Sequence, residues 1–478
     1  MSVHRAHDAV SRRDTRHTTR TTRRRRTAPQ GGRLLNATTE KRSRRRSIRR
    51  AVHSGYIIDN NVNVNVQRTL EAAAYTQSGL LRASSLHIPE SVCASCYRGK
   101  VRDTYTLRDG RLLMVATDRA SAFDRHVGCI PFKGAFLTAT SRYWMDIARD
   151  TLDFNTAMES SSSLSLSRAS ADAVSCGGNG DDDALVAEGL VDPNLTVMRR
   201  VTPLPFEMVV REYMSRSKTS TSLWHAYQRG ERRFCGHDLP EGLGANAQLR
   251  EAILTPTTKS EKGDVPCSGE DIVSSGCVSK GEWKKIEAMC IALFSLCASS
   301  VASSGLILAD TKFEIGRCPD TGELLLIDEV LTPDSSRFWM RDSYDERIAA
   351  GTDPESLDKE TMRRWIAARC PDPYAAETLP RIEPSVMADI AMRYALLQKK
   401  ATGLEPTTYI NLHLVHGDDG NGKAATAVVV PSADVVDNGA STACAYNEAE
   451  HGAATRLARN ISAYLGVDVQ TTRGAASF

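Results

Sequence analysis

Hydrophobic residues recur along the chain with two different spacings, one typical of strands and one typical of helices. The apolar run 112–117 follows a turn at 109–110, which predicts a hairpin leading into a buried strand. Nearer the N-terminus, Val62, Val64 and Val66 alternate with asparagines, and this alternation predicts a short exposed strand. The chain is therefore expected to contain sheet.

Longer stretches place apolar residues three and four positions apart, which is the spacing of one face of a helix. In 282–303 this face includes Trp283 and Ile286. The same kind of pattern predicts helices over 136–149, 385–400 and 452–465. The periodicity by itself shows only that strands and helices are mixed.

The stretch from 305 to 339 carries the clearest chemical signal. A buried strand over 305–309 runs directly into Asp310, Lys312 and Glu314. Alternate residues of a strand point to the same face, so these three charged side chains should share one face. Burying three charged side chains among such apolar neighbours would cost free energy, so they are expected to serve a site. A surface ladder of salt bridges is the weaker interpretation.

A second apolar strand, 324–327, follows the turn 319–322 and ends at Asp328 and Glu329. The two strands read as a hairpin, so Glu314 and Asp328 are expected to meet across it. Two such carboxylates suit Mg²⁺, which takes one or two carboxylates together with nucleotide phosphates and water. The hairpin is thus a predicted metal and phosphate site.

Three shorter segments add groups suited to anions or ligands. Gly99 lies among basic residues that include Lys100 and Arg102, and such a turn lets backbone N–H groups and cations meet phosphate oxygens. The segment 118–124 follows the buried strand, at a strand end where ligands often bind. Arg337, beside two serines, can hold a carboxylate or phosphate with a bidentate fork.

These segments, in this order, resemble one family closely, the SAICAR synthetases of purine biosynthesis, and most of all their plant-type and related bacterial single-function form. The resemblance covers about 95–405. The matching stretches are RGKVRD at 98–103, TDRASAFDR at 117–125, IPFKG at 130–134, VVREY at 209–213, TSLW at 221–224, LPEGL at 239–243, LTPTTK at 254–259, LADTKFEIG at 308–316 and LIDEVLTPDSSRFW at 326–339.

The resemblance implies both an activity and a fold. The family joins L-aspartate to the carboxylate of CAIR with ATP and Mg²⁺, giving SAICAR, ADP and phosphate, by way of an acyl phosphate. The implied fold is α+β and two-lobed. An antiparallel-sheet N-lobe and an ATP-grasp-like second lobe should enclose the active-site cleft. Because ATP, CAIR and aspartate are all anionic, cations must surround them.

The resemblance also implies roles for individual residues. Gly99, Lys100 and Arg102 match the turn over the ATP phosphates, and Glu314 and Asp328 match the metal-binding carboxylates.

Further positions match the reaction centre and the substrate contacts. Asp310 and Lys312 match the catalytic pair beside CAIR and the transferred phosphoryl group. The positions that match substrate contacts are Ser121, Asp124, Arg211, Ser222 and Arg337.

Two positions depart from the family pattern. Where the plant-type sequence has glycines after VVR, this chain has Glu212 and Arg216, and the loop 214–221 is one residue longer. Glycine permits backbone conformations that these side chains resist, so the substrate loop is expected to differ here.

Composition places the chain among soluble globular proteins, with 41% hydrophobic and 25% charged residues in 478. We expect neither a membrane span nor a disulfide scaffold. The net charge of +3 conceals an asymmetry, since residues 1–50 carry +14 and the rest −11. This arginine- and serine-rich segment is too polar to fold alone and is typical of a transit peptide. A nucleic-acid-binding arm and a solvated tail are the alternatives.

The predicted organisation has five parts. These are a disordered extension at 1–50, a linker at 51–94, an N-lobe at 95–205 with a low-complexity insertion at 159–183, a second lobe at 206–410 for ATP, metal and substrates, and a C-terminal extension of unknown role at 411–478. The expected partners are small molecules, namely CAIR, L-aspartate and ATP. No membrane or nucleic acid is expected, and a homo-oligomer is left open.

Two rival functions remain at this stage. One is a different ATP-dependent ligase or kinase on the same scaffold, with its substrate changed by Glu212 and Arg216. The other is a non-catalytic RNA-binding protein that uses the arginine-rich N-terminus. For location, the plant-type resemblance favours the plastid, with the mitochondrion and the cytoplasm as alternatives.

Overall fold

The computed structural model describes residues 63–77, 80–159, 191–217, 219, 221–259, 263–414 and 441–471. All of them belong to one unit, which spans 54–478. The arginine-rich segment 1–50 and nearly all of the predicted insertion at 159–183 lie outside the described residues.

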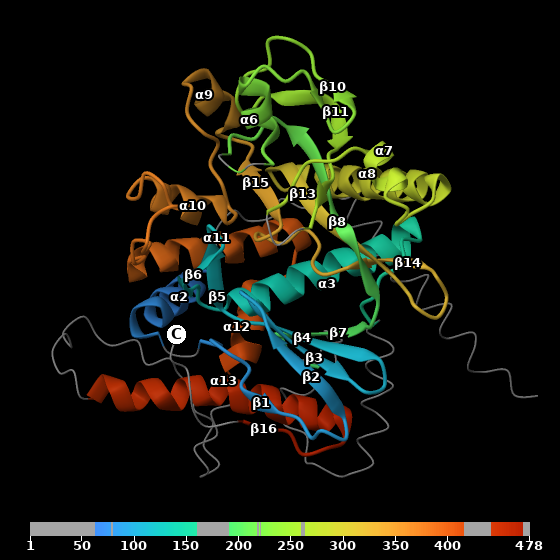
Figure 1. Ribbon diagram of the computed structural model, residues 1–478. Coiled ribbons are helices and arrows are strands. Elements are labelled where there is room, and N and C mark those ends of the chain that lie inside the picture. Colours follow the sequence, from blue (N-terminus) through green and yellow to red (C-terminus); the bar gives the residue numbers. More distant parts are fainter. Residues whose placement is uncertain are drawn as a thin grey trace, which may run out of the picture. The chain divides into compact units, whose positions relative to one another are not determined.

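A four-stranded antiparallel sheet forms the first lobe, in the order β2-β3-β4-β7 (Figure 1). The turn at 109–110 joins β3 to β4, so the predicted hairpin into a buried strand is confirmed. A separate hairpin of β5 and β6 follows. The bounds are Cys93–Arg98 for β2, Arg102–Leu107 for β3, Arg111–Ala116 for β4, Arg119–Ala122 for β5, Arg125–Cys129 for β6 and Leu195–Arg199 for β7.

A six-stranded sheet forms the second lobe around the long strands β8 and β13. β13 pairs antiparallel with β8 along one edge and with β14 and β15 along the other. The predicted hairpin of 305–309 with 324–327 is confirmed as β13 and β14. The bounds are Thr202–Tyr213 for β8, Gln248–Leu254 for β11, Thr257–Thr258 for β12, Leu306–Arg317 for β13, Leu324–Ile327 for β14 and Ser336–Met340 for β15, with a small pair of β9 (Arg233–Phe234) and β10 (His237–Asp238) beside them.

β8 crosses the predicted lobe boundary at 205–206. Because β8 is a strand of the six-stranded sheet from Thr202 onward, the second lobe begins before 206. The two sheets together give the α+β, two-lobed fold that was expected.

Four long helices confirm the periodicity analysis. Their bounds are Lys133–Leu152 for α3, Lys280–Ala302 for α8, Pro384–Thr402 for α11 and Ser441–Leu465 for α13. α3 contacts β4 and β7 of the first sheet as well as α8 and α11, so it joins the two lobes. The shorter helices are α6 (Leu223–Gln228), α7 (Gly269–Ser274), α9 (Tyr344–Ala349), α10 (Glu360–Ala367) and α12 (Pro406–Leu414).

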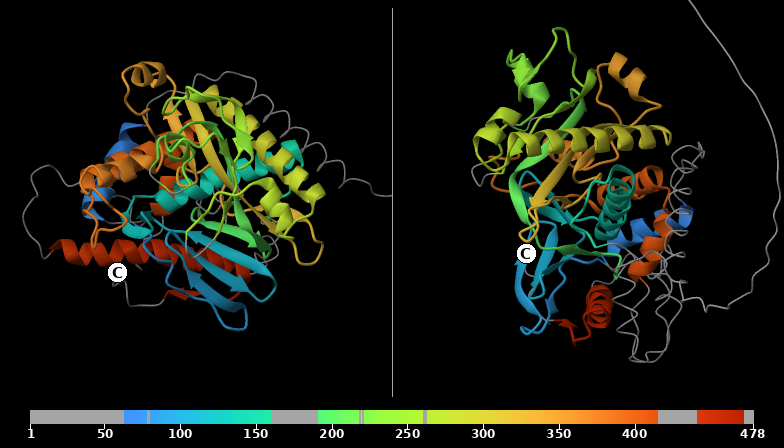
Figure 2. Two further views of the ribbon diagram at one scale, coloured as in Figure 1. Left: turned by 45° about the horizontal axis from the view of Figure 1, so that its top comes forward. Right: turned by 90° about the vertical axis from the view of Figure 1, so that its right-hand side faces the viewer.

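α8 lies along the six-stranded sheet (Figure 2). It is long and apolar enough to cross a membrane by length and composition alone, the one such helix among the described residues. Its buried side chains, which include Ile286, Leu293 and Phe294, face the protein interior, and the helix contacts β13 and β11. We interpret α8 as a helix that covers a sheet.

The prediction of a strand from the alternating valines at 62–66 is wrong. Residues Val64–Thr76 form helix α2, which Asn63 caps by accepting a hydrogen bond from the backbone N–H of Asn65 at 2.8 Å. Val66 and Leu70 lie four residues apart and are buried in a core cluster with α11. The run LEAAA at 70–74 favours helix, and packing against α11 outweighs the short valine alternation.

Candidate active site

The central strand β13 positions the charged face predicted from the sequence. Its Asp310 lies opposite Arg211 of β8 and Arg337 of β15 in the two strand registers. Two residues on, the Lys312 Nζ lies 2.5 Å from Glu314 Oε1, so these two alternate side chains share a face. The strand therefore carries an arginine-bound carboxylate at one point and a lysine–glutamate pair further along.

Lys312 is the centre of a cluster of carboxylates. Its Nζ lies 2.9 Å from Glu207 Oε1 and 4.0 Å from Asp328 Oδ2, in addition to its contact with Glu314. Burial lowers the pKa of Lys312, but Glu314 and the other acids outweigh it and hold that pKa above its usual value. Lys312 is therefore a permanent positive charge at neutral pH.

Glu314 is 7% exposed and pairs with both Lys312 and Lys259. Burial raises its pKa, yet the two ammonium groups outweigh burial and leave the pKa below the usual value. Glu314 is therefore ionised at neutral pH.

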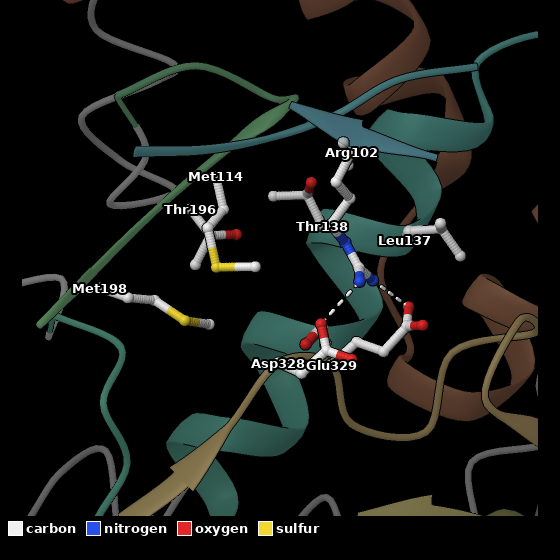
Figure 3. A pocket seen from close by; sticks show the side chains of 10 residues that line it. Arg102, Met114, Leu137, Thr138, Thr196, Met198, Asp328 and Glu329 are labelled. Carbon is white, nitrogen blue, oxygen red and sulfur yellow. Dashed lines mark hydrogen bonds and ion pairs between the residues drawn. The ribbon is translucent and has the colours of Figure 1, made fainter. Parts of the chain in front are cut away.

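Arg102 connects the first lobe to the hairpin of the second. From β3 its Nη1 donates to Asp328 Oδ1 at 2.7 Å, and its Nη2 pairs with Glu329 (Figure 3). The backbone of Asp328 has a φ of 61°, in the left-handed region that costs a non-glycine residue free energy. The strained turn after β14 thus directs two adjacent carboxylates toward one guanidinium.

A pocket lies beside this ion pair, and Figure 3 shows its side chains. The sheet of the first lobe and helix α3 form its walls, and Arg102 with the two carboxylates forms one end. Its lining combines apolar side chains and hydroxyl groups with the three charged groups, and its volume is about 10 Å³. The lining residues from the sheet and α3 are Met114, Ala116, Thr196, Met198, Leu137, Thr138 and Ser141.

Arg211 and Arg337 form a second cationic cluster around Asp310. The Arg337 Nη1 lies 2.9 Å from both carboxylate oxygens of Asp310. Burial lowers the pKa of Arg337, but Asp310 and Glu360 outweigh it and hold that pKa above its usual value. The Arg337 Nε is buried and has no hydrogen-bond partner among the described residues, so it can donate to a bound anion.

Ser121 lies near a third group of charges. Its Oγ accepts a hydrogen bond from Lys359 Nζ at 3.1 Å, and that ammonium lies 3.8 Å from Asp334. Lys133 pairs with the same carboxylate at 2.9 Å. Burial lowers the pKa of Lys359 to about 8, although Asp334 acts in the opposite direction.

Other predicted site residues lie further out. Lys100 and Asp124 form an exposed ion pair at 2.7 Å, and Gly99 makes a turn through its backbone N–H to Arg102. Ser222 is buried and caps α6, where its Oγ accepts from the N–H of His225 at 3.2 Å.

The two departures from the family pattern have partners of their own. Arg216 lies 3.3 Å from Asp353, and its backbone N–H donates to Asn246 at 2.8 Å. Glu212 accepts from Gln248 at 2.8 Å. The extra side chains are therefore accommodated at the rim of the loop.

The carboxylates fit a divalent cation. Glu314 and Asp328 both approach the Lys312 ammonium, so they converge on one small region beside the pocket. Two carboxylates leave most of a magnesium ion's positions open for phosphates and water, which is how nucleotide sites use that ion. No group of three or more His, Cys, Asp or Glu side chains suited to a metal occurs among the described residues.

Several residues of this cluster are not among the site residues predicted from the sequence. Glu207 and Arg211 lie four positions apart on β8, so they share one face of the strand. The same spacing of charged residues predicted the site on β13. Lys259 ends the motif LTPTTK, and its pairing with Glu314 is visible only in the structure. Lys133, Asp334 and Lys359 could not be identified as a group, because only the fold brings them together.

Comparisons with known proteins agree with this geometry. Residues 95–377 match the family described as SAICAR synthetase. The chain is 38% identical over 307 residues to a phosphoribosylaminoimidazole-succinocarboxamide synthase of Legionella pneumophila (strain Paris), covering 64% of this chain and 87% of that protein. A chloroplastic synthase of Arabidopsis thaliana is 38% identical over 306 residues, covering 64% of this chain and 66% of that protein.

A solved structure, the SAICAR synthase from Saccharomyces cerevisiae complexed with SAICAR, is also similar. Its TM-score is 0.51 at 28% identity, covering 67% of this chain and 97% of that one.

Proposed function

This chain belongs to the SAICAR synthetase family, and from that premise we propose that its charged cleft joins L-aspartate to the carboxylate of CAIR with ATP. The products are SAICAR, ADP and phosphate. The observation that carries the proposal is the position of the Lys312, Glu314 and Asp328 cluster beside the pocket that Arg102 closes. Three anionic reactants need cations of this kind around the reacting atoms.

The pocket between the first sheet and α3 is the proposed ATP site. The cavity has a volume of about 10 Å³, which is the space of about one water. An adenine ring would therefore enter only if the walls that carry Met114, Met198, Thr138 and Ser141 move apart. Arg102 would then face the phosphates, and Glu314 and Asp328 would hold Mg²⁺. The ion, when bound, neutralises phosphate charge as the phosphoryl group is transferred.

The second cluster is the proposed binding site for the anionic parts of CAIR and aspartate. Arg337 offers its unpaired Nε, and Asp310 holds that guanidinium in place through two hydrogen bonds. Lys312 remains charged and stabilises negative charge on the carboxylate as it becomes an acyl phosphate. The aspartate amine then attacks the acyl carbon and phosphate leaves.

Release of ADP by the purified chain tests this function. The assay contains ATP, Mg²⁺, CAIR and L-aspartate, with each omitted in turn. Release should need every component and should fall at least about 100-fold in Asp328→Asn. Asp320→Asn, an exposed carboxylate in the same hairpin, should keep activity. ADP release that does not depend on CAIR or on aspartate would favour the rival ligase or kinase instead.

We further propose that residues 1–50 direct the chain to the plastid. The support is their arginine- and serine-rich composition, together with the chloroplastic label of plant relatives. A fluorescent protein fused behind residues 1–50 should enter plastids. Accumulation in mitochondria or the cytoplasm would contradict this location without affecting the proposed chemistry.

A further inference from the structure

The C-terminal helix α13 lies beyond the part of the chain that matches the family, yet it packs against the first lobe (Figure 2). Leu457 and Ile461 are fully buried in a core cluster with the four-stranded sheet. After the helix, β16 (Gln470–Thr471) pairs antiparallel with β1 (Leu86–His87). The segment therefore covers one face of the sheet and is tied down at its end.

The opposite face of the same sheet lines the proposed ATP pocket. Neighbouring residues of a strand point to opposite faces, so each strand contributes to both sides. On β4, Leu113 and Val115 contact the cluster with α13, whereas Met114 lines the pocket. On β7, Val197 likewise contacts the cluster with α13, whereas Thr196 lines the pocket. α13 thus supports the wall of the pocket from behind, one strand layer away.

Arg456 of α13 makes buried polar contacts across this interface. Its side chain is 1% exposed, its Nε lies 3.0 Å from Asp192 Oδ2, and its Nη2 donates to Asn194 Oδ1 at 3.0 Å. Asn460, one turn further along the helix, donates to Asp192 Oδ2 at 2.9 Å. A charge this deeply buried is held by specific partners, so its position is well defined.

Asn194 connects Arg456 to the pocket by hydrogen bonds. Its Nδ2 donates to the carbonyl oxygen of Ala116 at 2.9 Å, and its own carbonyl accepts from the Ala116 N–H at 2.8 Å. Ala116 lines the pocket. The N-terminus of α3 approaches the same two residues so closely that a Cβ on Gly134 would lie 2.1 Å from the Ala116 oxygen. Arg456 therefore reaches both walls of the pocket through Asn194, which contacts Ala116 of the sheet and lies against Gly134 of α3.

We propose that Arg456 is a positioning residue of the nucleotide pocket, and that docking of α13 and binding of nucleotide are coupled. The inference rests on the proposed ATP site. Coupling of this kind is reciprocal, so nucleotide must hold α13 more tightly if α13 helps to shape the pocket. A purely structural helix would stabilise the fold and leave nucleotide affinity unchanged.

Hydrogen exchange on the full-length wild-type chain tests the coupling without any substitution. Exchange is measured with and without saturating Mg²⁺–ADP, and binding of a fluorescent ADP analogue is measured on the same sample. Amides of 453–465 should exchange at least about threefold more slowly with nucleotide, whereas those of α2 should not change. α2 is the matched reference, because it also lies outside the family match and is packed on α11.

Each result of that experiment is decisive. If the analogue does not bind, the proposed ATP site fails and this inference fails with it. If it binds but exchange at 453–465 is unchanged, or slows equally in α2, only the coupling is overturned.

A substitution provides the second test. Arg456→Lys keeps the positive charge and loses the fork that reaches Asp192 and Asn194 together. It should raise the KM for ATP about tenfold or more, leaving the KM for aspartate and kcat within about threefold. Arg459→Lys, on the exposed side of the same helix, is the control and should match the wild type. Equal KM values for ATP in the two variants would overturn the proposal.

Discussion

At the scale of single residues, the site depends on charges whose ionisation is set by their neighbours. Lys312 and Lys359 are both partly buried lysines, but their pKa values shift in opposite directions. Several acids surround Lys312 and keep it protonated. Lys359 lies 3.8 Å from Asp334, a carboxylate that also pairs with Lys133, so burial prevails there.

The lowered pKa of Lys359 predicts a dependence of stability on pH. From about 8 to its usual value of 10.5, the unfolded chain holds a proton that the folded chain has lost, so this residue's contribution rises with pH. The free energy of unfolding of the wild type relative to Lys359→Met should rise by up to about 3 kcal/mol over that window. Urea titrations at pH 7.5 and pH 10.5 measure it. Exposed Lys284→Met is the control, and a flat difference for Lys359→Met would contradict the prediction.

The Nε–H of Arg337 predicts a specific kinetic loss. Arg337→Lys keeps the charge but removes this N–H, which has no hydrogen-bond partner among the described residues. We expect kcat/KM for CAIR to fall about 10- to 100-fold, the value of one or two charged hydrogen bonds. Steady-state kinetics with Arg341→Lys, an exposed arginine just after the same strand, provide the comparison. Equal values for the two variants would remove Arg337 from substrate binding.

At the scale of elements, close approach of α3 to the first sheet fixes the pocket. A Cβ on Gly134 would lie 2.1 Å from the Ala116 oxygen and 2.4 Å from Asn194 Nδ2, both too short for any side chain. The glycine in the motif IPFKG is therefore explained by packing, since it lets the helix begin directly against β4.

Gly134→Ala should consequently disturb both stability and nucleotide binding. The backbone of α3 must move away from β4, and we expect a loss of about 2 kcal/mol or more in the free energy of unfolding. In Gly281→Ala, also within a helix, the new Cβ meets nothing within 4 Å, so stability should be equal or slightly higher. Denaturant unfolding of the two variants measures this difference. Similar midpoints would mean that α3 is not tightly seated.

At the scale of the whole molecule, the described site is drawn from distant parts of the sequence. Arg102 and Asp328 are 226 positions apart, and Arg456 and Asp192 are 264 apart. The described residues that form the proposed cleft run from Gly99 to Glu360.

Deletion of residues 1–50 should therefore leave catalysis intact. We expect kcat and every KM to remain within about threefold of the full chain, whereas binding to polyanions should weaken and lose its salt dependence as 16 arginines are removed. Coupled ADP release and a salt titration of RNA binding measure the two effects. Loss of turnover on deletion would favour a role for the segment inside the enzyme.

The sequence by itself determined the elements whose signals are local. The alternation of Asp310, Lys312 and Glu314, the hairpin to Asp328 and the face of α8 follow from strand and helix periods, which need no distant partner. The roles carried over from the family rest on long, ordered motifs.

Only the tertiary structure decided which distant groups meet. It paired Arg102 with Asp328 and Glu329, gathered Lys133 and Lys359 around Asp334, and placed α13 behind the pocket. It also made a helix of Val64–Thr76, where the alternating valines predicted a strand. The reason is physical, because burial against a partner contributes more free energy than the local preference of a short segment.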